Sequence, residues 1–378
     1  MKVLIVEYSK MNGFGGGIYF ARSVINWTAA VADEVTLLYP SDDGRSDPEL
    51  NPSVSLIPVK DSSSNRLRRF LRMMWTGHLH RFDIPFRELL SRQKFDLIVF
   101  HNSKGSRGLL DSARKSGARI VTVHDNYEYD YTKDSLPWYL RPLLLPATVR
   151  SEREALLGSD LNLALSQADA RVFREAYQLP ETCRVEVVGV SEYRHRDFPA
   201  LSDVDKPVFV MTGNLSARQT YESLIPWLRD YAPILYERVP DAKLIVAGKH
   251  PSETLKSILE EKGIEVVDTP PDMDAVLRRG RYYLCPVSKG SGVKLRVMDG
   301  LRNGLPVLVH ARSARGYELF IGDSVFPYEN QDSFVAALDR MLRTTVQKSE
   351  MVDRFRSSFS FESGTERFRN LVTPLFSK

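Results

Sequence analysis

The sequence predicts an α/β protein made of two Rossmann-like, doubly wound domains. Short apolar runs rich in valine, leucine and isoleucine alternate with helical patterns along most of the chain. Such alternation indicates parallel strands joined by right-handed crossovers. A polar stretch with two prolines, residues 197–207, interrupts the rhythm, which then begins again. A chain of 378 residues is long enough for two domains of ordinary size.

The first predicted domain covers residues 1–200 and opens with a buried strand that ends near glycines. Its helices are expected at 18–31, 107–116 and 168–177. Its strands are expected at 2–7, 34–39, 54–59, 97–101, 119–124, 161–164 and 185–188.

The second predicted domain covers residues 201–358, and a final helix within 359–378 is expected to cross back to the first domain. Helices of the second domain are expected at 221–236, 253–262, 273–279 and 293–302. Its strands are expected at 208–212, 243–247, 264–267, 282–286 and 306–309. Open α/β sheets bind ligands at the carboxyl ends of their strands, so we expect a site there.

Composition excludes several classes of protein. The chain has 52 basic and 48 acidic residues, and this net charge of +4 gives no indication of nucleic-acid binding. Two distant cysteines form neither a disulfide framework nor a zinc site. The N-terminal apolar run has the length of one strand, and no stretch reaches the roughly 18 to 20 apolar residues of a membrane span. We expect a cytoplasmic protein, which is compatible with peripheral attachment to the inner face of the cell membrane.

The most informative segment is residues 286–308, PVSKGSGVKLRVMDGLRNGLPVL. Gly290 and Gly292 precede a predicted helix, whose first amides and dipole favour an anion. Lys294 falls in the first turn of that helix, where a cation opposes the dipole, so binding a phosphate is a better reason for it than a structural role. Asp299 follows and can accept hydrogen bonds from ribose hydroxyls. The alternative is a surface loop with a solvated lysine and aspartate.

A second glycine cluster, NGFGGG at 12–17, lies between the first strand and its helix. Gly15, Gly16 and Gly17 allow backbone amides to approach a phosphate or an acceptor molecule. The G-x-G-x-x-G spacing and the acidic residue after the second strand are both missing, which disfavours a nicotinamide cofactor. The alternative is a tight turn.

A third cluster, HDNYEYDY, directly follows the strand predicted at 119–124. His124 can donate a hydrogen bond to a substrate hydroxyl or to a developing charge. Asp125 and Glu128 can orient an acceptor. The alternative is a histidine that only satisfies the polar end of a strand.

The run GSGVKLRVMDGLRNGLPV resembles the donor-site motif of family 4 glycosyltransferases, in the subgroup that reads GSGxKxKxxEAxxxGxPV. Upstream, FVMTGNLSARQTYESLIPWLRDYAPILYERVPDAKLIVAGKHP is similar to the same subgroup's first strand, donor loop and following helix and strand. The resemblance covers most of residues 207–330. It implies the GT-B fold, in which two domains face a central cleft, and a retaining hexosyltransferase that uses a UDP- or GDP-linked sugar without metal or other cofactor.

The resemblance also assigns roles. Arg218 and Lys294 would neutralise the leaving diphosphate, His124 would lie near the donor sugar and acceptor, and Asp299 would replace the family's ribose-binding glutamate. Ser291 stands where many members have a first glutamate, which faces the donor sugar. The expected donor-binding residues are Gly213, Asn214, Arg218, Gly290, Ser291, Gly292, Val293, Lys294 and Asp299. The expected acceptor-binding residues are Gly15, Gly16, Gly17, Asp125 and Glu128.

Two further segments allow more than one interpretation. Asp272 and Asp274 form a D-x-D, the metal–diphosphate motif of the other large glycosyltransferase fold, but Asp272 is placed as a helix N-cap and we predict no metal site. Residues 66–82, from Arg66 to Phe82, form a basic amphipathic pattern suited to an anionic membrane surface or to a helix packed on its own sheet. Residues 136–145, with Trp138 and Tyr139, form either a second apolar patch or a buried loop.

The expected reaction is therefore transfer of a sugar to a lipid-linked or growing polysaccharide acceptor. Three alternatives remain at this point. A sugar-nucleotide epimerase would need acid–base groups in both domains, and a nicotinamide oxidoreductase would need the missing fingerprint. The third is a catalytically inactive, membrane-associated scaffold of GT-B type.

Overall fold

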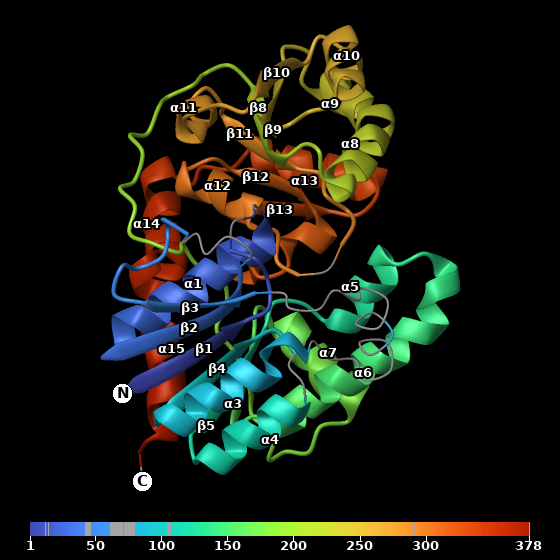
Figure 1. Ribbon diagram of the computed structural model, residues 1–378. Helices are drawn as coiled ribbons and strands as arrows, with labels where there is room; N and C mark the ends of the chain where they lie inside the picture. Colours follow the sequence, from blue (N-terminus) through green and yellow to red (C-terminus); the bar gives the residue numbers. More distant parts are fainter. Residues whose placement is uncertain are drawn as a thin grey trace. The chain divides into compact units, whose positions relative to one another are not determined.

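The computed structural model describes residues 1–11, 13, 15–41, 47–60, 71, 80–103, 107–290 and 292–377. The chain forms two compact units (Figure 1). Unit 1 comprises Met1–His195 together with Phe361–Lys378, and unit 2 comprises Arg196–Ser360. The division thus falls between residues 195 and 196, directly before the polar stretch at 197–207, and the last helix belongs to unit 1.

The sheet of unit 1 has seven strands in the order β3-β2-β1-β4-β5-β6-β7, and its ladders are parallel. Its strands are β1 (Lys2–Glu7), β2 (Glu34–Pro40), β3 (Ser55–Val59), β4 (Leu97–His101), β5 (Arg119–His124), β6 (Leu161–Ala164) and β7 (Val185–Val187). Strand β1 lies in the interior of the sheet, and its residues Val3 to Val6 are fully buried because helices cover both faces (Figure 1).

Helices of unit 1 surround this sheet. They are α1 (Gly16–Val31), α3 (Asp83–Arg92), α4 (Arg107–Ser116), α5 (Glu128–Ser135), α6 (Arg141–Gly158), α7 (Gln167–Tyr177) and α15 (Phe361–Val372), with short 3-10 turns η1 (His80–Phe82), η2 (Trp138–Leu140) and η5 (Thr373–Leu375). Alternate strand residues such as Leu4 and Val6 pack against Phe86 of α3 and Leu109 of α4.

Helix α15 packs on α1, although the whole of unit 2 separates the two in sequence. The rings of Trp27 and Phe368 lie 6.3 Å apart. The Arg367 guanidinium donates to the carbonyl oxygens of Val188 at 2.8 Å and Val190 at 3.0 Å. Gly364 leaves room for Ser191, because a Cβ there would overlap that side chain. The last helix is therefore part of the core of unit 1.

Unit 2 has a second parallel sheet, of six strands in the order β10-β9-β8-β11-β12-β13. Its strands are β8 (Val208–Asn214), β9 (Lys243–Lys249), β10 (Glu265–Asp268), β11 (Tyr282–Cys285), β12 (Val307–His310) and β13 (Val325–Tyr328). Its helices are α8 (Arg218–Asp230), α9 (Ala232–Arg238), α10 (Glu253–Glu261), α11 (Met273–Leu277), α12 (Arg296–Arg302), α13 (Gln331–Leu342) and α14 (Lys348–Phe359), with 3-10 turns η3 (Ala311–Ala314) and η4 (Glu318–Phe320).

The α/β class with two Rossmann-like sheets is confirmed. The helix predicted at 221–236 is wrong as a single element: α8 ends at Asp230 and α9 begins at Ala232, because Pro233 near the start of α9 cannot continue the hydrogen bonding of α8. The helix predicted from residue 293 begins only at Arg296. The backbone of the preceding loop, with φ of +82° at Gly290 and +72° at Gly292, is left-handed rather than helical.

Candidate functional site

The carboxyl edge of the unit 2 sheet carries the loop from β8 to α8. Asn214 shapes this loop, because its Oδ1 accepts from the amide of Ser216 at 3.1 Å and from its hydroxyl at 2.7 Å. Helix α8 then begins after Ala217, which has no side chain that can accept from the first amides. Such an uncapped helix start favours an anionic ligand.

A second loop, from β11 to α12, lies against the first. A Cβ on Gly213 would lie 2.7 Å from Cζ, 2.7 Å from Nη1 and 2.9 Å from Nη2 of Arg296. These nearly equal distances indicate that the guanidinium faces Gly213 with its flat side. In the same way, a Cβ on Gly290 would lie 2.6 Å from three atoms of the Gln219 amide. Each loop thus contributes a glycine on which a planar side chain of the other loop rests.

Arg296 also reaches the first turn of α8, where its Nη2 donates to Oγ1 of the buried Thr220 at 3.0 Å. Sequence reasoning missed Arg296 as a site residue. It lies inside the informative run at 286–308, and it occupies the second basic position of the motif GSGxKxK. This position in the motif is the signal by which the sequence could have identified Arg296.

Lys294 lies two residues before α12, so its expected place in the first helical turn is wrong. Its Nζ donates to the carbonyl oxygen of Gly292 at 3.4 Å. Burial, together with the positive charges of Arg296, Arg312 and Arg315, lowers the pKa of the Lys294 ammonium to about 8. A partly buried ammonium among three guanidinium groups is stabilised by a bound anion.

Asp299 lies in the first turn of α12 and turns back to the end of β8. Its Oδ2 accepts from Oγ1 of Thr212 at 2.9 Å, and that hydroxyl lies 2.7 Å from the hydroxyl of Tyr283. Burial raises the pKa of the Asp299 carboxyl to about 6. Arg296 contacts Gly213 and Asp299 is bonded to the neighbouring Thr212, so these residues lie together at one end of the sheet.

The remaining predicted donor residues are placed differently. Arg218 is the first residue of α8, but its side chain is 82% exposed and its Nε donates to Glu222 at 2.5 Å. Lys289 contacts the same carboxylate at 3.0 Å. Val293 packs against Gly316. Ser291 lies outside the described residues.

The D-x-D segment caps a helix, as predicted. Oδ1 of Asp272 accepts from the amide of Ala275 at the start of α11. Asp274 forms ion pairs with Arg302 and Arg196. Although burial raises its pKa, hydrogen bonds from Arg302 and Asn303 hold the pKa of Asp274 below the ordinary value. Within the part of the chain that the structure describes, no group of three histidine, cysteine or acidic residues is arranged to hold a metal ion.

In unit 1, the predicted acceptor residues follow the carboxyl ends of β1 and β5. Helix α1 begins directly after Gly15, whose φ is +144°. A Cβ on Gly17 would lie 3.5 Å from Oδ2 of Asp125, so this carboxylate faces the first turn of α1. The Asn102 amide donates to Asp125 at 3.1 Å and to Glu128 at 2.9 Å. The structure therefore brings Gly17, Asp125 and Glu128 together around Asn102, which sequence reasoning missed.

Glu128, the first residue of α5, and Glu152 on α6 are both buried. Oε1 of Glu152 accepts from the Glu128 amide at 2.9 Å, and Oε2 accepts from the Tyr177 hydroxyl at 2.5 Å. Burial raises the pKa of Glu152 to about 8, against the effect of these two hydrogen bonds. This buried network fixes the position of α5.

His124 is 2% exposed and rests on the ring of Phe173. The Asn162 amide nitrogen donates to the carbonyl oxygen of Leu156, so its Oδ1 is the atom that accepts from His124 Nε2 at 3.1 Å. Nδ1 of His124 is then an acceptor, not the donor that sequence analysis expects. Burial lowers the pKa of the imidazole to about 4, so the ring is neutral at pH 7.

A buried Glu7–His101 pair lies beside this cluster and was also missed. Oε2 of Glu7 contacts Nδ1 of His101 at 2.5 Å, and Oε1 accepts from the Ser9 amide at 2.6 Å. Both residues end neighbouring parallel strands, β1 and β4. The available signal was a histidine directly after an apolar run, the pattern that identified His124.

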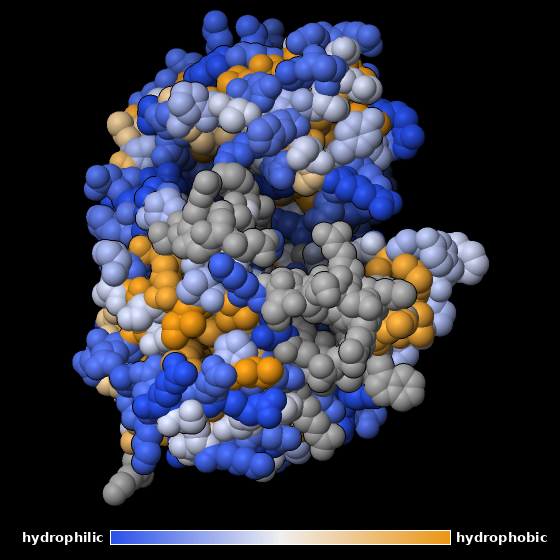
Figure 2. Space-filling view, in the orientation of Figure 1, coloured by the Kyte–Doolittle hydropathy of each residue, from blue (hydrophilic) through white to orange (hydrophobic). Residues whose placement is uncertain are grey.

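Most of the basic segment 66–82 lies outside the described residues. The second segment, 136–145, is not a buried loop. It forms η2 and the start of α6, and Trp138, Tyr139 and Leu143 are 77%, 62% and 52% exposed. Figure 2 shows apolar residues at the surface over the hairpin of α5 and α6. No helix of the described chain has the length and apolar character needed to cross a membrane.

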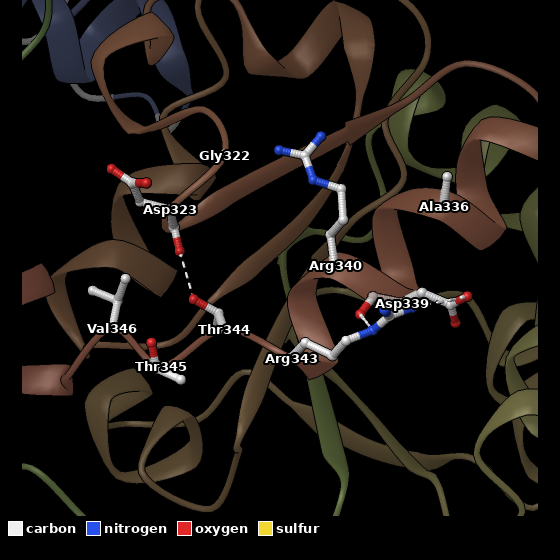
Figure 3. Close-up of a pocket in the computed structure, with 9 residues that line it drawn as sticks. All are labelled: Gly322, Asp323, Ala336, Asp339, Arg340, Arg343, Thr344, Thr345 and Val346. Atoms are coloured by element: carbon white, nitrogen blue, oxygen red, sulfur yellow. Dashed lines mark hydrogen bonds and ion pairs between the residues drawn. The ribbon is translucent and has the colours of Figure 1, made fainter.

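A cavity of about 640 Å³ in unit 2 does not belong to these loops. Its lining comes from the loop before β13, the end of α13 and residues 344–346 (Figure 3). Because every ladder of the sheet is parallel, this is the amino edge, opposite to Gly213 and Arg296. Arg340 and Arg343 at its rim stand in the last turn of α13 or directly after it, where cations stabilise the helix dipole.

Comparison with known proteins identifies the class. Residues 14–189 match the family described as Glycosyltransferase Family 4, and residues 206–344 match the family described as Glycosyl transferases group 1. An uncharacterised 44.6 kDa protein in the cps region of Klebsiella pneumoniae is 30% identical over 115 residues. That match covers 28% of this chain and 30% of the relative, so the chain is matched to less than a third of the relative's length.

Solved structures share the fold over the whole chain. The lipopolysaccharide outer core galactosyltransferase WaaB, in its apo form, superposes with a TM-score of 0.67 at 15% identity, covering 99% of this chain and 100% of that one. Sucrose-phosphate synthase from Thermosynechococcus elongatus gives 0.70 at 11% identity, with 100% and 99% covered. Anabaena Alr3699/HepE in complex with UDP and glucose gives 0.65 at 12% identity, with 99% of each chain covered.

The two units thus define a glycosyltransferase of GT-B fold. The chain belongs to the family 4 type of glycosyltransferases, with both halves of the sequence matched. Sugar transfer is the activity of this class, and the predicted family is confirmed.

Proposed function

We propose that the protein transfers a hexose from a UDP- or GDP-linked sugar to a carbohydrate or lipid-linked acceptor, with retention of configuration and without a metal ion. The observation that carries the proposal is the pair of glycine loops in unit 2. They place the uncapped start of α8, the partly buried ammonium of Lys294 and three guanidinium groups at one edge of the sheet. An anion with several charges, such as a nucleoside diphosphate, fits this arrangement.

The proposed role of this site is electrostatic. When the bond from the sugar to the diphosphate breaks, negative charge grows on the leaving phosphate oxygen. Donors and cations that are already oriented stabilise this charge without reorganising. Lys294 and Arg218 are the residues proposed for this role, and the cations near Lys294 supply the charge that a metal ion provides in other transferases.

On the acceptor side, we propose that the start of α1 at Gly15–Gly17, together with Asp125 and Glu128, orients the incoming hydroxyl. In a retaining reaction the hydroxyl oxygen attacks the anomeric carbon on the face that the diphosphate leaves. The new C–O bond forms as the bond to the phosphate oxygen breaks, and that oxygen takes the hydroxyl proton. His124, as a neutral acceptor at Nδ1, is proposed to orient a sugar hydroxyl rather than to protonate the leaving group.

A lipid-linked acceptor at an anionic bilayer is supported by the exposed Trp138, Tyr139 and Leu143. Exposed Lys133 and Arg150 lie on the same two helices, and the segment 62–82 has no acidic residue. Tryptophan and tyrosine prefer the region between water and lipid tails, and basic groups prefer anionic headgroups. We therefore propose peripheral attachment to the inner face of the cell membrane through this hairpin.

Binding of UDP, GDP and their sugars in the presence of EDTA tests the donor site. We expect calorimetry and thermal shift to detect binding that Lys294→Ala weakens by about tenfold or more, since an ammonium–phosphate contact is charge-assisted. Lys262→Ala is the matched control, because Lys262 is exposed at the end of α10. If no nucleotide binds, or if both variants bind equally well, the donor site is wrong. Binding without turnover on any acceptor would favour the inactive scaffold instead.

A further inference from the structure

We propose that Asn102 is the positioning residue of the acceptor site in unit 1: its single amide nitrogen fixes the carboxylates of Asp125 and Glu128 and turns Asp125 towards the start of α1. The inference rests on the proposed function, because it explains how the acceptor residues of that function are held in place. Three observations carry it: the two hydrogen bonds of the amide nitrogen, the backbone conformation of Asn102, and the direction of the Asp125 carboxylate.

The first observation is that one nitrogen serves both carboxylates. Nδ2 of Asn102 donates to Oδ1 of Asp125 at 3.1 Å and to Oε1 of Glu128 at 2.9 Å. An ionised carboxylate only accepts, so the nitrogen end of the amide faces both groups, with one hydrogen for each. Two like charges side by side repel, and the hydrogens between them offset this repulsion. The amide therefore determines where both carboxylates lie.

The second observation is the backbone conformation of Asn102, which directly follows β4. Its φ is +79°, in the left-handed region, and its backbone N–H donates to the carbonyl oxygen of Val123 on the neighbouring strand at 2.7 Å. Glycine adopts this conformation at less cost than any residue with a side chain. Residue 102 is nonetheless an asparagine, and it is buried. Its side-chain amide therefore gives a reason for a strained residue at this position.

The third observation is the direction of Asp125. Because Asn102 holds Oδ1, the other oxygen, Oδ2, faces the first turn of α1, where a Cβ on Gly17 would lie 3.5 Å from it. Within the described ranges of the chain, Oδ2 has no hydrogen-bond donor. The carboxylate thus has one oxygen fixed by the protein and one that a substrate hydroxyl can reach. Without the amide, Asp125 would be released to rotate away from α1.

These contacts give Asn102 an indirect part in sugar transfer. In the proposed reaction the attacking hydroxyl gives its proton to the leaving phosphate oxygen, so Oδ2 of Asp125 accepts from a neighbouring hydroxyl of the acceptor sugar. This second contact fixes the orientation of the attack. Water has no second hydroxyl group to be held, so hydrolysis of the donor does not depend on Asp125 or on the amide that positions it.

The experiment compares these two reactions in the full-length protein. Transfer is measured to octyl glycosides of glucose, galactose and N-acetylglucosamine, and hydrolysis is measured with the same UDP- or GDP-linked sugar in their absence. Asn102→Asp keeps the shape of the side chain and the tolerance of a positive φ angle but loses both hydrogens. We expect it to lower transfer by about tenfold or more, and to change hydrolysis and the affinity for UDP or GDP by less than about twofold.

The pH dependence of Asn102→Asp separates a lost hydrogen from a damaged fold. As the pH falls from about 8 to about 5, three adjacent carboxylates favour the uptake of a proton. A protonated carboxyl group again donates a hydrogen bond. Transfer by this variant, relative to the wild type at the same pH, should therefore rise by about threefold or more. An equal ratio at every pH contradicts the proposed role of the amide.

Two further variants complete the test. Asn102→Gly adopts the positive φ angle without strain but has no amide, so it should lose transfer as Asn102→Asp does, and it also serves if the aspartate variant fails to fold. Asn330→Asp is the matched control. Asn330 is exposed at the start of α13, and its Oδ1 accepts from the Ser333 amide at 2.9 Å, which an aspartate oxygen can do equally well. This control should transfer sugar as the wild type does.

The outcomes distinguish this inference from the proposed function. If the wild type transfers sugar to none of the glycosides, the proposed acceptor site fails and this inference fails with it. If the wild type transfers but Asn102→Asp or Asn102→Gly transfers equally well, or if transfer and hydrolysis fall together, only the present inference is overturned. A selective loss of transfer in both variants supports it.

Discussion

The guanidinium of Arg296 lies in the space that a side chain at Gly213 would fill. A Cβ at residue 213 would come within 2.7 Å of the guanidinium carbon, and φ of Gly213 is +150°. The contact with Arg296 and the positive φ angle therefore both require glycine at residue 213. This single relationship connects the end of β8 to the start of α12 and brings two loops from distant parts of the sequence into one site.

Gly213→Ala should reduce donor binding and turnover by at least about tenfold, because the new methyl group displaces Arg296 and strains the backbone. Titration calorimetry with nucleoside diphosphates and an assay of sugar transfer measure the effect. Gly263→Ala is the matched control: φ of Gly263 is +68°, but a Cβ there meets open space. Equal losses in both variants would show that backbone strain alone, not the contact with Arg296, accounts for the effect.

Lys294 predicts proton uptake when a nucleotide binds. In the free protein burial lowers the pKa of Lys294 to about 8, and a bound phosphate raises it again by favouring the charged form. At pH 8 binding should therefore take up about half a proton, and at pH 7 only about a tenth. Calorimetry in buffers of different ionisation enthalpy measures this uptake. Lys294→Arg should abolish it at both pH values, and uptake that persists in that variant would contradict the assignment.

His124 predicts a loss of stability in mild acid. The pKa of the buried imidazole is lowered to about 4 from an ordinary value of 6.5, so the unfolded chain binds a proton that the folded chain does not. The stability that the protein has with a neutral His124 is fully present above pH 6.5. As the pH falls towards 4, the free energy of unfolding decreases by about 3 kcal/mol at most. Urea unfolding of the wild type and of His124→Asn across this range measures it. As the pH falls, the free energy of unfolding should decrease less steeply for the variant than for the wild type. An equal decrease in both proteins would refute the prediction.

Strand positions were largely predictable from the sequence. The predicted strands at 2–7, 97–101, 119–124 and 161–164 coincide with β1, β4, β5 and β6. Each is a short apolar run buried on both faces, and this local pattern determines a central parallel strand. The N-cap at Asp272 was predictable for the same reason, since a cap depends on its own few residues.

Features that depend on distant contacts were not predictable. Nothing near Gly213 in the sequence indicates that Arg296 lies upon it. The tautomer of His124 is determined by the hydrogen bond that its Nε2 donates to Oδ1 of Asn162 on the neighbouring strand. The late start of α12 depends on the left-handed loop at Gly290 and on the packing of Val293 against Gly316. Periodicity carries no information on such long-range pairs.

The α5–α6 hairpin predicts binding to anionic membranes. Replacing Trp138 and Tyr139 together by serine should lower binding to vesicles that contain anionic lipid by about fivefold or more, because two interfacial aromatic rings are lost. Ile84→Ser is the control, since Ile84 is 67% exposed on α3. Vesicle sedimentation gives the affinities, with neutral vesicles for comparison. Unchanged binding of the double variant would remove the hairpin from the proposed membrane contact.

Helix α15 has a consequence for the order in which the protein can fold during synthesis. Trp27 on α1 packs against Phe368, and Arg367 satisfies two carbonyl oxygens after β7, yet the ribosome makes these partners only after the whole of unit 2. Unit 2 is contiguous in sequence and can close as soon as residue 360 has emerged. The domain that is translated first is therefore the one that is finished last, and until then the apolar face of α1 stays uncovered in the nascent chain.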